Sequence, residues 1–167
     1  GSKELVPGIK GIDGANVVMA ADAELHPEKL GKRVVIMGGG LVGTEAAVSF
    51  AHEGKTCVVI EMRDQVAADA NSFYRGGLMP EVEKSAEIYT DTMVKEVQAN
   101  GVLCERNGET FVIEADTVVC ALGYRSDYGK VDALCEKADE SYVIGDCSKV
   151  GLIYHAVNQG YYTAMQL

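Results

Sequence analysis

The stretch that decides the fold is Arg33-Val-Val-Ile-Met37-Gly38-Gly39-Gly40-Leu41-Val42-Gly43-Thr44-Glu45. A short apolar run leads directly into a GxGxxG turn, and an alanine-rich segment follows it. The apolar run predicts a buried strand, and the following segment predicts a helix over about residues 42–53 that ends at Gly54. A strand, turn and helix in this order are typical of a site that binds the pyrophosphate of a dinucleotide.

The glycines of this turn have different predicted tasks. Gly38 permits a tight turn out of the strand, Gly40 lets the backbone approach the pyrophosphate, and Gly43 lets the helix pack closely on the strand. The free N–H groups and the positive dipole end of the helix then face the phosphates. An ordinary turn without a ligand is the alternative. The neighbours that we expect to add backbone groups and an apolar wall are Gly39, Leu41 and Val42.

A second apolar run, Thr56-Cys-Val-Val-Ile60, predicts the next parallel strand, with Glu61 at its end. An acid at this position accepts hydrogen bonds from the adenosine ribose and repels a 2′-phosphate. The sequence therefore favours NAD(H) over NADP(H). Met62 and Arg63 complete the predicted ribose-binding segment. Arg63 argues the other way, because a guanidinium can bind a 2′-phosphate, unless it is only a solvated loop charge.

Composition excludes several classes of function. Of 167 residues, 47% are hydrophobic and 24% are charged, which is typical of a globular protein. The formal net charge of −10 argues against nonspecific binding to nucleic acid or to anionic membranes. No apolar run approaches the length of a membrane span. The five cysteines show no CxxC spacing and are odd in number, so we expect a cytoplasmic protein without a metal site.

The rest of the chain predicts a mixed set of elements. Residues 1–30 are expected to form a connecting segment with one strand at 16–19, and residues 66–85 two helical pieces broken at Gly76-Gly77 and Pro80. Two hairpin signals, at 99–101 and at Asn107-Gly108, predict an antiparallel β-meander. The further strands are expected at 87–89, 116–120 and 141–147, and a closing helix at about 152–167.

The order of these features resembles flavin-dependent pyridine nucleotide oxidoreductases with two dinucleotide-binding domains. The resemblance rests on the GxGxxG turn, the acid, the meander, Ala121-Leu-Gly123, Val143-Ile-Gly-Asp146 and the closing helix. Residues 7–9, 14–18 and 121–126 are most similar to the group of NADH:flavin oxidoreductases, 2,4-dienoyl-CoA reductase, enoate reductase and trimethylamine dehydrogenase. The implied fold class is α/β, a Rossmann-like parallel sheet with an antiparallel meander as the crossover.

In that family the NAD(P) domain is inserted into an FAD domain. The resemblance therefore implies a crossover segment at 1–30, an NAD(P)-binding domain at 31–120 and a returning part of the FAD domain at 121–167. An earlier GxGxxG turn for FAD and a flavin-binding barrel are absent from this sequence. We expect a fragment of a larger enzyme that is inactive when isolated, with NAD(P)H and the missing FAD and barrel domains as its partners.

Further site residues follow from the resemblance alone. Glu45 corresponds to an acid near the nicotinamide, and Val94 to a residue that lines the adenine pocket. Ala121 and Gly123 belong to the segment that passes the nicotinamide ribose. Gly145 and Asp146 correspond to the second flavin motif, in which the acid binds the ribityl chain. No catalytic side chain is expected, because the cofactors themselves perform hydride transfer.

Two functions remain open at this point. The first is an NAD(H)-binding module that presents the nicotinamide for hydride transfer to FAD. The second is a noncatalytic Rossmann module that binds ADP or no nucleotide and has a structural or docking role.

Overall fold

The computed structural model describes all residues from 1 to 167, and the chain divides into two compact units. The larger unit is Val6–Gly123, and the smaller combines Gly1–Leu5 with Tyr124–Leu167. Most of the predicted connecting segment therefore folds with the larger unit. The assignment of the two units to NAD(P) and FAD domains stays a prediction.

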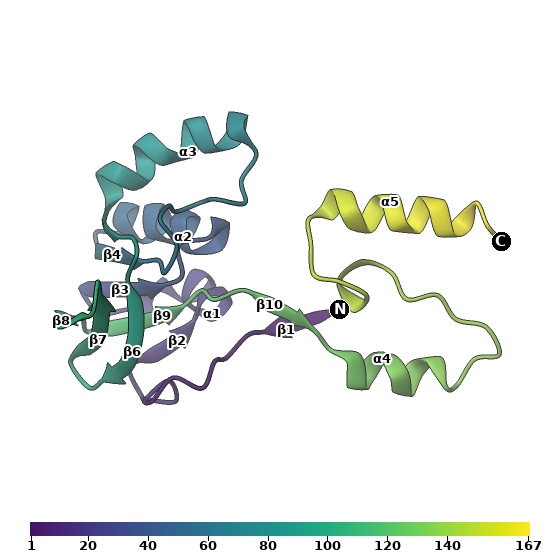
Figure 1. Ribbon diagram of the computed structural model, residues 1–167, viewed down its shortest axis with the longest axis horizontal. Helices are drawn as coiled ribbons and strands as arrows, with labels where there is room; N and C mark the ends of the chain where they lie inside the picture. Colours follow the sequence, from purple (N-terminus) through teal and green to yellow (C-terminus); the bar gives the residue numbers. More distant parts are fainter. The chain divides into compact units, whose positions relative to one another are not determined.

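A parallel sheet forms the centre of the larger unit, and its five strands in sheet order are β2 (Val17–Met19), β9 (Thr117–Cys120), β3 (Arg33–Met37), β4 (Thr56–Ile60) and β5 (Ala86–Tyr89) (Figure 1). In the register of the central strands, Val35 pairs with Val58 on one side and with Val118 on the other. All four pairings of neighbouring strands are parallel. The predicted α/β fold is confirmed.

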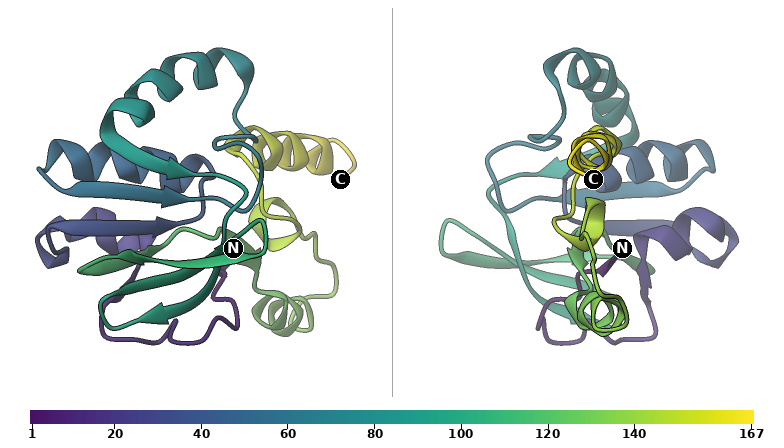
Figure 2. Two further views of the ribbon diagram at one scale, coloured as in Figure 1. Left: turned by 60° about the vertical axis from the view of Figure 1, so that its left-hand side comes forward. Right: turned by 90° about the vertical axis from the view of Figure 1, so that its right-hand side faces the viewer.

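Both faces of this sheet are buried, because alternate side chains of each strand enter different core clusters. Val34 and Ile36 face a cluster that includes Phe50, whereas Val35 and Met37 face the opposite cluster. The first face is covered by α1 (Ala20–Leu25), α2 (Leu41–His52) and α3 (Ser72–Ser85). The second is covered by β6 (Met93–Gln98), β7 (Gly101–Arg106) and β8 (Glu109–Glu114) (Figure 2).

The antiparallel meander β6-β7-β8 forms as predicted. Asn107 and Gly108, which join β7 to β8, have φ angles of 54° and 83°. Two consecutive positive φ angles give the tight turn that matches the twist of a hairpin, and asparagine followed by glycine is the sequence that adopts them most readily.

Helix α3 corrects the expectation of two broken helical pieces. It runs without interruption through Gly76, Gly77 and Pro80 over 14 residues (Figure 1). Pro80 removes one backbone hydrogen bond but does not end the helix. Asn71 caps its first turn, and Met79 packs against the buried cluster beneath it, so capping and tertiary packing outweigh the local helix breakers.

The smaller unit contains β1 (Ser2–Glu4), β10 (Tyr124–Ser126), α4 (Tyr128–Cys135), the 3-10 turn η2 (Gly145–Cys147) and α5 (Ile153–Ala164). Strands β1 and β10 pair antiparallel. The strand expected at 141–147 does not form. Ile144 has an extended backbone, with φ −131° and ψ 164°, but an extended segment becomes a strand only beside a partner strand, and none pairs with it.

None of the helices is both long and apolar enough to cross a membrane.

Candidate nucleotide-binding site

The glycine turn follows β3 at the carboxyl edge of the parallel sheet, where ligands of open α/β sheets bind. Gly38 has a φ of 103°, and its N–H donates to the Ile60 carbonyl at 2.9 Å. A Cβ atom on Gly38 would lie 2.5 Å from the Ala121 carbonyl oxygen. The turn is therefore held between the ends of β4 and β9, and only glycine fits there.

Gly40 and Gly43 differ in their surroundings. A Cβ atom on Gly43 would collide with the carbonyl oxygen of Gly38, so the start of α2 packs directly on the turn. A Cβ atom on Gly40 would meet nothing within 4 Å. Gly40 also has φ −69° and ψ −173°, which any residue can adopt. The protein's own packing therefore explains Gly43 but does not explain Gly40.

The start of helix α2 carries N–H groups that no side chain caps. Gly40 is the N-cap residue, and a side-chain hydrogen bond to the first turn is absent. The buried Thr44 hydroxyl turns back instead and donates to the carbonyls of Gly40 and Leu41, at 2.8 and 3.0 Å. Uncapped N–H groups and the positive dipole end together favour an anion at this position.

Glu61 lies directly beside the glycine turn. It is 6% exposed, and its Oε2 accepts a hydrogen bond from the Gly39 N–H at 2.8 Å. Its Oε1 accepts from the backbone N–H of Arg63 at 2.9 Å and from Arg63 Nε at 3.3 Å. These bonds fix a nearly buried carboxylate next to the turn, and a carboxylate has lone pairs for further donors such as ribose hydroxyls.

Arg63 is held from a second side by Asp69, a residue that no sequence motif identified. Arg63 Nη1 donates to both carboxylate oxygens of Asp69, at 3.3 and 3.2 Å. Burial lowers the pKa of Arg63, but the hydrogen bonds and charges of Asp69 and Glu61 outweigh it and raise the pKa overall. The guanidinium is thus a fixed cation with two acidic partners.

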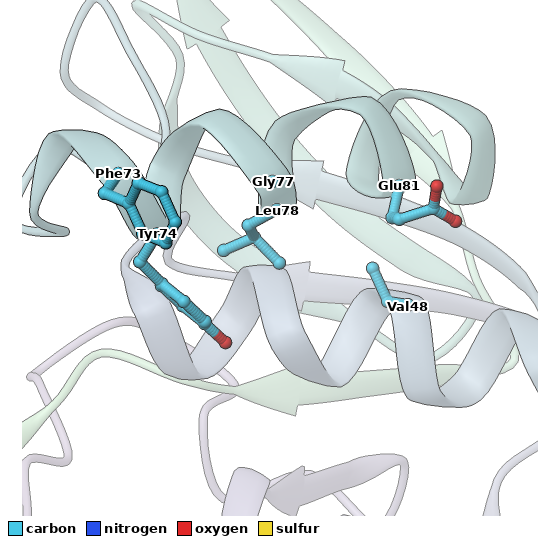
Figure 3. Close-up of a pocket in the computed structure, with 6 residues that line it drawn as sticks. All are labelled: Val48, Phe73, Tyr74, Gly77, Leu78 and Glu81. Carbon is cyan, nitrogen blue, oxygen red and sulfur yellow. The ribbon is translucent and has the colours of Figure 1, made fainter.

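Glu45, in helix α2, also has a partner that the sequence did not reveal. The Tyr74 hydroxyl donates to Glu45 Oε1 at 2.6 Å and joins α3 to α2. This hydrogen bond and the Glu45 charge raise the pKa of Tyr74. An open cavity of about 340 Å³ lies beside this contact between the two helices (Figure 3). Its lining residues are Val48, Phe73, Tyr74, Gly77, Leu78 and Glu81.

The other predicted site residues lie at three places. The Ala121 carbonyl lies next to the glycine turn, and Gly123, two residues later, has a φ of 94°. Val94 lies in β6 and packs against the cluster on the meander face of the sheet. Gly145 and Asp146 lie in η2 of the smaller unit. Within the larger unit, the glycine turn contacts Glu61 and lies beside Ala121, and Glu61 contacts Arg63, whereas the Met62 side chain is exposed. Glu45, Val94 and Gly123 belong to the same unit.

The Gly145-Asp146 turn is built by hydrogen bonds within the smaller unit. Gly145 has a φ of 62°, and its N–H donates to Gln159 Oε1 at 2.6 Å. Asp146 Oδ1 accepts from the Gly151 N–H at 3.1 Å, and Oδ2 from the Ser2 hydroxyl at 3.2 Å. These contacts fix the turn and the direction of the Asp146 carboxylate.

The groups around the glycine turn suit a dinucleotide. They are the uncapped N–H donors at the start of α2 and the fixed carboxylate acceptor of Glu61, with open space beside Gly40. No group of three or more His, Cys, Asp or Glu side chains is placed to hold a metal ion.

Comparison with known proteins gives consistent matches along nearly the whole chain. The family model described as pyridine nucleotide-disulphide oxidoreductase matches residues 1–160. A bilirubin reductase of Mediterraneibacter gnavus is 33% identical over 98% of this chain and 26% of its own length. An NADH oxidase of Thermoanaerobacter brockii is 31% identical over 100% of this chain and 27% of its own length.

Among solved structures, a 2-naphthoyl-CoA reductase superimposes with a TM-score of 0.87 and 31% sequence identity. The match covers 100% of this chain and 26% of that protein. The chain therefore spans about a quarter of the length of these relatives.

Proposed function

The chain belongs to the pyridine nucleotide-disulphide oxidoreductase family, and from that premise we propose that its larger unit binds NAD(H) and presents the nicotinamide to FAD. The family predicted from the sequence is confirmed. The relatives are much longer than this chain. Oxidoreductase activity of the complete protein is therefore part of the proposal. The proposal also includes an FAD that is held mainly by sequence outside this chain.

The open space at Gly40 carries the proposal. The other glycines of the turn are required by the fold, since a Cβ atom on Gly38, Gly39 or Gly43 would come too close to neighbouring atoms. Gly40 has no such neighbour. A pyrophosphate that approaches the backbone closely supplies the missing reason for glycine at this position.

Glu61 supports NAD(H) as the nucleotide. A ribose whose 2′- and 3′-hydroxyls donate to a carboxylate gains two charge-assisted hydrogen bonds, whereas a 2′-phosphate would bring a second negative charge beside Glu61. The Gly39 N–H holds the carboxylate in place, so little side-chain entropy is lost when the ribose binds. Preference for NAD(H) over NADP(H) follows.

The smaller unit supports the second half of the proposal. No residue of α4 or α5 is buried, and α5 exposes large apolar side chains that a water-facing helix rarely carries together. These exposed side chains are Ile153, Tyr154, Val157, Tyr161 and Tyr162, and Met165 follows directly after the helix. We assign this surface to contact with the FAD and barrel domains of the complete protein, with Asp146 near the flavin.

In this proposal the chain has no catalytic side chain of its own. When bound, a nicotinamide would supply a hydride for a flavin, and the protein would determine the distance, the orientation and the access of water. The backbone N–H groups at the start of α2 hold the phosphates, and Glu61 holds the adenosine ribose. Glu45, with its carboxylate fixed by Tyr74, contributes to the nicotinamide end.

Calorimetric titration of the chain with NADH, NADPH and ADP tests the proposal. We expect NADH to bind with a dissociation constant on the order of micromolar, more tightly than ADP or NADPH. Gly40→Ala and Glu61→Ala should each weaken NADH binding at least about tenfold. Gly76→Ala is the matched control, because Gly76 also has open space around it but lies in α3. The affinity of this variant for NADH should equal that of the wild type.

A specific outcome would support the noncatalytic alternative instead. If ADP binds as tightly as NADH, the nicotinamide contributes nothing, and the chain is better described as an adenine-nucleotide or docking module.

A further inference from the structure

Arg63 lies two residues after Glu61, the predicted ribose-binding acid. Arg63 is 41% exposed at its side chain, and a free guanidinium at such a position is well suited to a 2′-phosphate. Here it is not free. Nε contacts Glu61 at 3.3 Å, and Nη1 contacts both oxygens of Asp69 at 3.3 and 3.2 Å.

The loop that carries Asp69 is anchored to the nucleotide turn itself. The Ala67 N–H donates to the Gly39 carbonyl at 2.7 Å, and Ala67 holds a φ of 49° that L-residues rarely adopt. Val66 and Ala67 are buried, and the Val66 carbonyl accepts from Arg75 at 3.2 and 3.4 Å. Asp69 is therefore presented to Arg63 from a fixed loop.

Stability alone gives a weak reason for this contact. The side chain of Asp69 is 75% exposed, and ion pairs of exposed groups contribute little to folding. The contact has a larger effect on the orientations that the Arg63 guanidinium can adopt. An arginine whose Nη1 is bound to Asp69 has to give up that partner before it can turn to a phosphate.

We propose that Asp69 is a positioning residue for nucleotide specificity, which holds the Arg63 guanidinium away from an incoming 2′-phosphate and so preserves the preference for NAD(H). The inference rests on the proposed function, since it requires that the nucleotide ribose lies at Glu61. Glu61 repels the 2′-phosphate, and Asp69 withholds the cation that could compensate for that repulsion. Removal of the Asp69 charge frees the Nη1 end of Arg63, while Nε keeps its contact with Glu61.

The test compares dissociation constants for NADH and NADPH in the full chain at one ionic strength. In Asp69→Asn we expect NADPH binding to tighten about fivefold and NADH binding to change less than about twofold. Asp69→Glu, which keeps the charge, should retain the wild-type ratio. Asp64→Asn is the matched control, because it removes an exposed acid from the same loop and should leave the ratio unchanged.

The double variant Asp69→Asn, Arg63→Gln separates release of Arg63 from a general loss of negative charge. If the inference holds, the tighter NADPH binding of Asp69→Asn disappears when Arg63 is also replaced. An unchanged ratio in Asp69→Asn, or a gain that persists without Arg63, would overturn it while NADH binding itself leaves the proposed function intact. A wild-type chain that binds neither NADH nor ADP, or that prefers NADPH, would overturn both.

Discussion

Gly40 and Gly43 lie in the same turn, yet replacement by alanine should affect the folding stability of the protein at Gly43 and hardly at Gly40. A Cβ atom on Gly43 would collide with the Gly38 carbonyl, and backbone atoms cannot move aside as a flexible side chain can. Gly43→Ala should therefore lower the free energy of unfolding by about 2 kcal/mol, in the range of other overpacked sites. Gly40→Ala should change it by less than about 0.5 kcal/mol.

Urea unfolding followed by circular dichroism measures both values. Equal losses in the two variants would contradict the packing described for the start of α2. The same measurement shows whether Gly40→Ala is folded. Only in a folded variant does a loss of affinity for NADH report on contact with the pyrophosphate.

The buried thiols of Cys57 and Cys104 should make the free energy of unfolding depend on pH in the alkaline range. Burial raises the pKa of the Cys57 thiol from 9.0 to about 11, with the charge of Lys55 offsetting only a part, and burial alone raises the pKa of the Cys104 thiol from 9.0 to about 11. Between these values the unfolded chain loses protons that the folded chain keeps. The unfolded state then binds fewer protons, so the free energy of unfolding falls as pH rises from about 9 to about 11.

The slope of stability against pH in this range is the measurement, taken from urea unfolding at several pH values. Cys104→Ala should make the slope shallower, whatever it does to stability at pH 7.5, since one of the titrating groups is gone. A slope that is the same with and without Cys104 would contradict its assignment as a buried neutral thiol.

At the residue scale, the sequence predicted those contacts that depend on local spacing. Gly38, Gly43 and Glu61 lie near one another as expected, because a strand, a tight turn and a helix have fixed geometry. Asp69 and Tyr74 belong to no motif. Their contacts depend on how a loop and a helix fold back over the turn, and a single sequence does not specify that path.

At the scale of elements, apolar runs and turn signals predicted the parallel strands and the meander, because a strand buried on both faces has to be continuously apolar. The errors arose where tertiary context decides. Helix α3 continues through Pro80 because its cap and its packing hold it. Residues 141–144 stay outside any sheet because an apolar run cannot supply its own partner strand.

The cap of α3 gives a prediction at this scale. Asn71 Oδ1 accepts a hydrogen bond from the Tyr74 N–H at 2.9 Å, which satisfies a donor that has no partner inside the helix. Asn71→Ala should lower the free energy of unfolding by about 1 kcal/mol, and Asn71→Asp should restore most of it. Thermal unfolding of the three proteins measures this. No difference between alanine and aspartate would show that packing alone holds the helix.

At the scale of the whole molecule, the two compact units differ in how completely they are covered. The larger unit buries both faces of its central sheet, whereas the helices of the smaller unit bury no residue. The relatives extend over about four times the matched length, which is consistent with a surface that is covered in the complete protein. Under the proposed function, electron transfer to a flavin would require both units, whereas nucleotide binding would require only the larger one.

We propose above all that NADH binds at the turn from Gly38 to Gly43 with its adenosine ribose at Glu61. Amide NMR of the labelled chain during a titration with NADH tests it most directly, because each backbone N–H reports on its own surroundings. We predict the largest shifts at Gly40, Leu41 and Val42 and at the two N–H groups bonded to Glu61, those of Gly39 and Arg63. In Gly40→Ala the same shifts should require at least about tenfold more NADH. Unchanged amide signals, or shifts confined to other parts of the chain, would contradict the claim.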